Sequence, residues 1–72
     1  MDTKMTESLG EALPREMARV RDELLPLYNA IPTGVFAATL MRSALDRAAT
    51  ALATGDTVEM IRVYNDLREF RA

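Results

Sequence analysis

The stretch ATGDTVE, residues 53–59, combines the end of one helix with the start of the next. Glycine adopts the left-handed backbone conformation that closes a helix without a Cβ penalty, and this is the role predicted for Gly55. Asp56 is placed to cap the following helix, and Glu59 has the spacing that completes a capping box. Two helices joined by so short a turn must run antiparallel and pack on each other. The stretch therefore predicts a tight helical hairpin.

Working outward from this turn, the sequence predicts an all-α fold, a small three-helix bundle in a single domain over residues 1–72. Helices are expected at about 12–30, 34–53 and 57–70, and residues 1–10 are expected to form a disordered lead-in. In the first helix, apolar residues recur at alternating steps of three and four, which is typical of one buried seam. The seam comprises Leu13, Met17, Val20, Leu24, Leu27 and Ile31.

Pro26 interrupts this first helix. It removes a backbone hydrogen bond to Asp22 and disfavours a helical conformation at Leu25. Because the apolar seam continues in phase beyond the proline, we expect one helix that is kinked near Pro26. The alternative is a helix that ends at Leu24, followed by a loop over residues 26–32.

The middle helix follows Pro32, and the hydroxyl of Thr33 is placed to cap it. Large apolar residues mark its expected core stripe: Phe36, Leu40, Leu45 and Leu52. Small residues form a second stripe, which lets another backbone approach closely: Ala37, Ala44, Ala48 and Ala51. Two such stripes predict that the middle helix has neighbours on two sides.

Composition and charge exclude several classes of function. The 72 residues contain no Cys and no His, and the net charge is −2. Disulfides, thiolate ligands and the commonest general base are therefore absent, and no positive field attracts a polyanion. The uncharged run from Asn29 to Met41 contains a proline and a glycine, so it is not expected to span a membrane. The N-terminus lacks the layout of a signal peptide, and the cytoplasm is the expected location.

No catalytic constellation is recognisable, and we expect a protein that is not an enzyme and uses no cofactor or metal. A nucleophilic triad needs a base, and the only Lys lies in the N-terminal lead-in. The acidic residues alternate with Arg at helical spacing, which is typical of exposed ion pairs. A DNA-binding helix-turn-helix is the alternative, because two helices meet at a Gly-containing turn. Against it, Glu59, Asp66 and Glu69 lie among the arginines of the would-be recognition helix.

The last helix carries more apolar surface than a single inward stripe needs. The inward stripe is expected at Met60, Ile61, Tyr64 and Leu67. The surplus predicts a contact strip for a second copy or another protein, formed by Met60, Val63, Leu67 and Phe70. In that interpretation the protein is a homodimer through this helix, with the first helix as the alternative interface, and Phe70→Glu dissociates it without unfolding. In the simpler interpretation, all four residues belong to the core.

Residues 23–31 and 59–67 resemble each other at an offset of 36, with Glu, Tyr and Asn coinciding. Either the echo is coincidental, or Tyr28 and Tyr64 occupy equivalent places on either side of the middle helix. A helical-repeat array needs about three such units, and the chain has room for two.

Three segments together carry a wider resemblance. LPREMARVRDELLPLYNAIP (13–32), GVFAATLMRSALDRAATALATGD (34–56) and VEMIRVYNDLREF (58–70) resemble the short helical proteins of bacterial prophages and other mobile elements. The resemblance rests on the Arg/Ala-rich three-helix layout and on the ALATGD turn, and it carries no catalytic or binding residue. It implies a genomic setting in which small proteins often bind, block or retarget a host protein.

Overall fold

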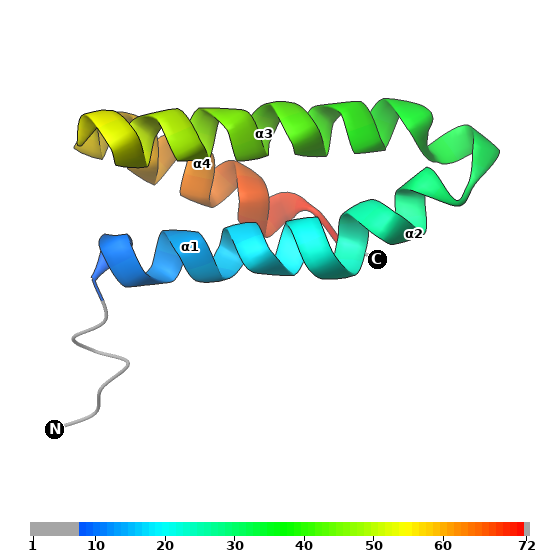
Figure 1. Ribbon diagram of the computed structural model, residues 1–72, viewed down its shortest axis with the longest axis horizontal. Helices are drawn as coiled ribbons and strands as arrows, with labels where there is room; N and C mark the ends of the chain where they lie inside the picture. Colours follow the sequence, from blue (N-terminus) through cyan, green and yellow to red (C-terminus); the bar gives the residue numbers. More distant parts are fainter. Residues whose placement is uncertain (1–7, 72) are drawn as a thin grey trace, which may run out of the picture.

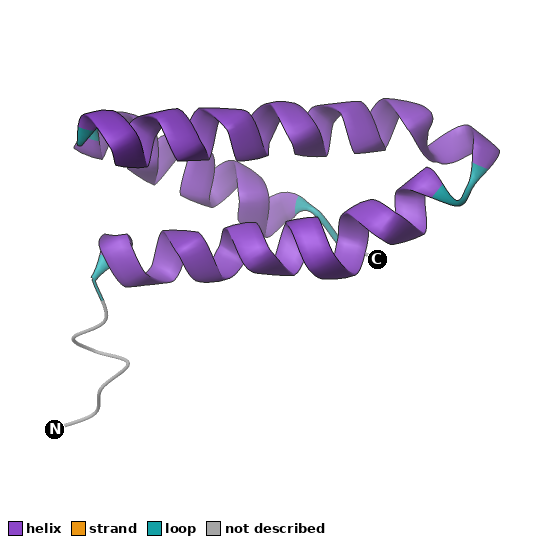
Figure 2. Cartoon of the chain, in the orientation of Figure 1, coloured by secondary structure: helices purple, strands orange, loops and turns teal. Residues whose placement is uncertain are grey.

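A computed structural model describes residues 8–71, in which the chain is all-helical and three helices pack together (Figure 1). No strand occurs in this range (Figure 2). In chain order, the elements are α1 (Leu9–Arg19), a π-helical turn η2 (Val20–Leu24), α2 (Leu25–Asn29), a 3-10 turn η3 (Pro32–Gly34), α3 (Val35–Thr54) and α4 (Thr57–Glu69).

The first helix begins earlier than predicted. Residues 1–7 of the expected lead-in lie outside the described residues, whereas Leu9 and Gly10 are already helical. Ser8 occupies the N-cap position with an extended backbone, but its hydroxyl contacts the carboxylate of Glu11 at 3.2 Å and makes no capping bond to a backbone N–H.

The turn between α3 and α4 has the backbone geometry that its sequence predicts. Gly55 has a φ of 69° and a ψ of 28°, which is the left-handed conformation. The N–H of Asp56 donates to the carbonyl of Ala51 at 3.0 Å, and the Asp56 carboxylate accepts from the N–H of Glu59 at 3.1 Å. The reciprocal half of the capping box is wrong, because the Glu59 carboxylate binds Arg47 on α3. Figure 1 shows α4 folding back along α3 from this turn.

Asp56→Ala is expected to lower the free energy of unfolding by about 1 kcal/mol, because the N–H of Glu59 loses its acceptor at the first turn of α4. Urea denaturation followed by circular dichroism measures the change. Ser8→Ala is the matched control, since Ser8 occupies an N-cap without a capping bond and its removal should leave the midpoint in place. Equal effects of the two substitutions would contradict the capping role of Asp56.

The π turn η2 resolves the conflict between Pro26 and the helix that contains it. Backbone angles stay helical through η2 and into α2, so the alternative of a loop beginning at residue 26 is wrong. The N–H of Leu25 donates five residues back, to the carbonyl of Val20. This wider turn includes one extra residue and rotates everything after it relative to α1. As a result, Tyr28 packs against the core, and the predicted seam residues Leu27 and Ile31 are exposed instead.

The inward face of α3 consists of small residues and one methionine: Ala38, Met41, Ala44, Ala48 and Ala51. The predicted core stripe is wrong at its N-terminal half, where Phe36 is 75% exposed and Leu40 is 45% exposed. Leu45 and Leu52 are partly buried beside the core. An alanine face lets neighbouring helices approach the α3 backbone closely, and large side chains are then displaced to its flanks.

Gly34, at the N-cap of α3, allows the corner between α2 and α3 to close. It is buried, and a Cβ at this position would overlap the backbone carbonyl of Tyr28. Its N–H donates to the carbonyl of Ile31 at 2.8 Å. The predicted cap is wrong, because Thr33 lies within the 3-10 turn and makes no capping bond to α3.

Candidate interaction surface

The contact strip predicted on α4 faces the core. Val63 and Leu67 are 0% exposed, and Met60 and Phe70 are partly buried against the same cluster. The reason is that α4 packs on both α1 and α3, and these two helices together cover the apolar residues of the predicted strip. The strip is therefore not a free surface. The predicted inward position of Ile61 is also wrong, since this residue is about half exposed.

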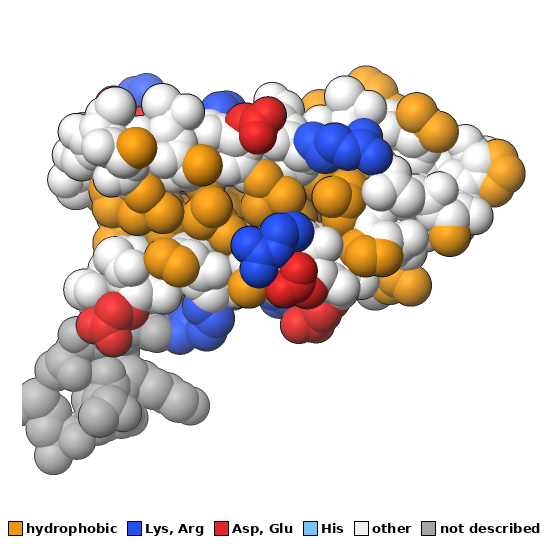
Figure 3. All heavy atoms as spheres, viewed as in Figure 1, with side chains coloured by type: hydrophobic (Ala, Val, Ile, Leu, Met, Phe, Trp, Pro, Cys, Tyr) orange, Lys and Arg blue, Asp and Glu red, His pale blue; other side chains and the backbone are white. Residues whose placement is uncertain are grey.

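Large apolar side chains are exposed elsewhere, around the corner between α2 and α3. We call this set the corner patch: Leu27, Ile31, Val35, Phe36 and Leu40. Figure 3 shows hydrophobic side chains at the end of the molecule where α2 turns into α3, with no charged side chain in view there. The sequence pattern does not indicate this surface, because four of the five residues fall in stripes that are predicted to be buried: Leu27, Ile31, Phe36 and Leu40.

The corner patch is exposed because α4 is shorter than α3. With 13 residues against 20 and a rise of about 1.5 Å per residue, α4 is roughly 10 Å shorter. It starts at the Gly55 turn and ends before the N-terminal part of α3. Leu40 and Phe70 line the same shallow hollow, which joins the corner patch to the end of α4.

The segment that forms the corner contributes no charged side chain. Between Glu23 and Arg42 the sequence contains no Asp, Glu, Lys or Arg. The guanidinium of Arg42, at the edge of this segment, donates to the side-chain oxygen of Asn29 at 2.6 Å and ties α3 to α2. The corner therefore presents apolar side chains with one guanidinium beside them.

Polar contacts hold the C-terminal end of α4 beside the corner. The guanidinium of Arg19 donates to the carbonyl of Leu67 at 2.8 Å and to that of Phe70 at 3.1 Å. It also binds the carboxylate of Glu16 at 3.0 Å. The carbonyl of Leu67 also accepts the N–H of Phe70, and the Arg19 guanidinium adds a second donor at this end of α4. The hydroxyl of Tyr28 donates to the carbonyl of Arg71, so α1 and α2 both bind the last described residues.

The internal echo is not accompanied by a repeated set of contacts. Tyr28 and Tyr64 both pack against the core. Whereas Tyr28 donates to a backbone carbonyl, Tyr64 has the guanidinium of Arg68 over its ring at 5.6 Å. The structure therefore offers no common role for the two tyrosines.

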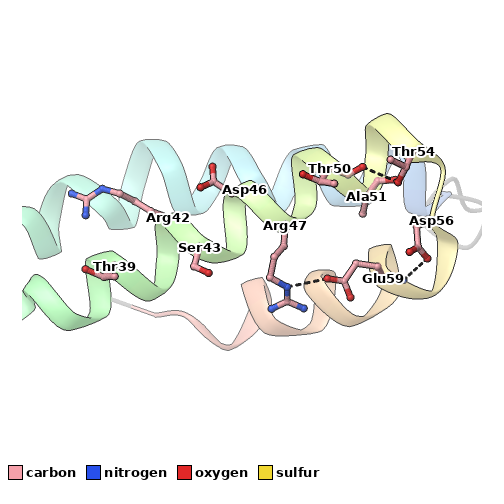
Figure 4. Close-up of a pocket in the computed structure, with 10 residues that line it drawn as sticks. All are labelled: Thr39, Arg42, Ser43, Asp46, Arg47, Thr50, Ala51, Thr54, Asp56 and Glu59. Atoms are coloured by element: carbon pink, nitrogen blue, oxygen red, sulfur yellow. Dashed lines mark hydrogen bonds and ion pairs between the residues drawn. The ribbon is translucent and has the colours of Figure 1, made fainter.

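A polar hollow of about 550 Å³ lies along α3 and the start of α4. Its lining residues are shown in Figure 4: Thr39, Arg42, Ser43, Asp46, Arg47, Thr50, Ala51, Thr54, Asp56 and Glu59. Arg47 donates to Glu59 and to Asp66 at 2.9 Å each, and these hydrogen bonds raise the pKa of Arg47. The charges of Arg47, Glu59 and Asp66 therefore serve to join α3 to α4.

The exposed neighbours Arg21 and Asp22 bind each other at 2.9 Å, and this hydrogen bond lowers the pKa of Asp22. Among residues 8–71, no three acidic side chains come together as metal ligands would. In the same range, no helix has the length and apolar character needed to cross a membrane.

Comparisons of the chain with protein families, curated proteins and solved structures found no match. The case for a function therefore rests on the chain's own surfaces. Of these, the corner patch is the one that gathers large exposed apolar residues in a segment without charged residues.

Proposed function

We propose that this protein is a small three-helix bundle, with α3 and α4 as an antiparallel hairpin, that acts as a non-catalytic protein–protein interaction module. An adaptor, an inhibitor and an accessory subunit all fit this description. The observation that carries the proposal is the corner patch, which exposes five large apolar residues in one uncharged part of the chain.

The extent of the exposed surface supports a binding role. With typical side-chain areas, the exposed fractions of the five residues amount to roughly 500 Å² of apolar surface. Single exposed apolar residues are normal on a soluble protein, whereas a patch of this size is comparable to the largest one on a typical monomer, which is often functional. Phe36 has the chemistry of an interface anchor, because it is aromatic and 75% exposed.

The π turn η2 supports the same conclusion independently. A regular α-helix would have continued the apolar seam and turned Leu27 and Ile31 inward. The π turn rotates them outward at the cost of less favourable helix geometry. Departures from regular structure of this kind concentrate at functional sites.

The sequence resemblance to prophage-encoded proteins supports a bacterial setting, with the cytoplasm as the compartment. Proteins of that setting often act on the host, so the partner is a host protein or a second copy of this chain. An uncharged patch selects a partner that presents an apolar surface of matching shape.

Affinity capture from a bacterial lysate tests the proposal. The baits are the wild-type chain, Phe36→Glu and Val58→Glu. Val58 is 60% exposed on the first turn of α4, close to the Gly55 turn, and controls for loss of a surface apolar residue outside the corner patch. We expect protein that is retained by the wild type and Val58→Glu, and lost at least tenfold with Phe36→Glu. Retention of the same proteins by all three baits would refute binding of a host protein at the corner.

The helix-turn-helix alternative has weaker support. Arg47 beside the Gly55 turn is bound to Glu59 and Asp66, and Arg19 is bound to backbone carbonyls and Glu16, so these cations are already engaged. Retention on heparin that weakens steeply with salt would favour the DNA-binding regulator. Elution in the void at low salt would leave the interaction module in place.

A further inference from the structure

We propose that the occupant of the corner patch is a second copy of this chain, bound through a two-fold symmetric contact. This inference rests on the proposed function and adds the identity of the partner. It replaces the contact strip on α4 as the site of self-association.

The segment that forms the corner patch has no charged residue of its own, which favours a symmetric contact, and the Arg42 guanidinium beside it is held by Asn29. In a two-fold interface the same surface meets itself, so residues near the axis face their own copies. A charged side chain there would meet the same charge, which is unfavourable when both are removed from water. The segment between Glu23 and Arg42 contains no charged residue, and it supplies all five members of the corner patch.

The available area matches the requirement of a weak dimer. Two copies of the corner patch would together bury roughly 1,000 Å², which is about the lower limit for a specific interface. The nearby hollow holds Leu40 and Phe70 together with the charged Arg47, Asp66 and Glu69, so it marks the polar edge of the contact. Phe36 is the natural anchor, because a central aromatic residue supplies much of the binding free energy in such interfaces.

Sedimentation equilibrium of the purified chain, from about 5 to 500 µM, tests the proposal. For the wild type, we expect the weight-average mass to rise from 8.0 kDa toward twice that value. Phe36→Glu should remain at the monomer mass throughout, with an unchanged far-ultraviolet spectrum that shows it is folded. Val58→Glu should follow the wild-type curve.

Cysteine cross-linking locates the contact, and the absence of native cysteine makes each introduced thiol unique. Leu40→Cys places a thiol in the corner patch, and Val58→Cys places one outside it. With a short bifunctional maleimide, we expect covalent dimer from Leu40→Cys in several-fold excess over that from Val58→Cys. The reverse preference would show that the copies meet through another face, and would overturn the proposal.

A wild-type chain that stays at monomer mass up to 500 µM would also overturn self-association. That result is distinguishable from a failure of the proposed function, because the lysate capture uses dilute bait and asks only whether other proteins depend on Phe36. A monomer whose captured partner is lost with Phe36→Glu retains the interaction module and rejects the dimer. If the chain forms a dimer but Phe36→Glu captures the same lysate proteins as the wild type, the dimer is retained and binding of other proteins at the corner is rejected.

Discussion

Leu67→Ala is expected to lower the free energy of unfolding by about 2–5 kcal/mol, enough to unfold much of a chain this small. Leu67 has no exposed surface and belongs to the cluster that α1, α3 and α4 share. Truncation removes the transfer free energy of the side chain and leaves a cavity between three helices, which can collapse only partly. Urea denaturation monitored by circular dichroism measures the loss.

Leu40→Ala is the matched control, since it makes the same truncation at a residue that is 45% exposed. At a chain concentration below the dimer range, we expect it to cost well under 1 kcal/mol. The comparison separates a core residue from an interface residue, because the contact-strip hypothesis predicts the opposite order. A fully folded Leu67→Ala chain with altered self-association would restore the strip on α4.

Gly34→Ala is expected to cost about 2–3 kcal/mol. The added Cβ would overlap the carbonyl oxygen of Tyr28 and lie 3.0 Å from its carbonyl carbon. Both atoms belong to the backbone, so no side chain can rotate away, and α2 must move relative to α3. Thermal unfolding at fixed chain concentration provides the measurement.

Gly10→Ala is the control for the loss of glycine itself. A Cβ there meets nothing closer than the Ser8 hydroxyl at 3.7 Å, which is an ordinary contact. Because alanine favours the helix by roughly 0.5–1 kcal/mol over glycine, this variant should be slightly more stable than the wild type. Destabilisation of equal size at both positions would mean that the contact with Tyr28 does not limit the corner.

The features that sequence alone predicted are those set by local chemistry. The end of α3 needs a residue with a left-handed backbone, which Gly55 supplies, and the start of α4 needs an acceptor for a free N–H, which Asp56 supplies. Both features are visible within a few residues of sequence. The helix that precedes them was predicted at 34–53 and is found at Val35–Thr54. Its N-terminal cap was less predictable, because the turn before it depends on how α2 approaches Gly34.

The features that could not be predicted depend on a register or on a neighbour. A π turn inserts one residue into the helical period without any glycine to mark it, so the phase of Leu27 and Ile31 was lost. The choice between the alanine and the large-residue faces of α3 depends on how closely α1 and α4 approach. The signal that could have indicated the corner patch was the uncharged run that ends at Met41, which was used only to exclude a membrane span.

The bonds from Arg19 to the carbonyls of Leu67 and Phe70 join the first helix of the chain to the last turn of α4. The two helices that they connect also share the core residues Leu13, Val20, Val63 and Leu67. A fragment containing only two of the helices would therefore lose both its apolar cover and its helix cap. We therefore expect all three helices to be gained or lost in one cooperative transition.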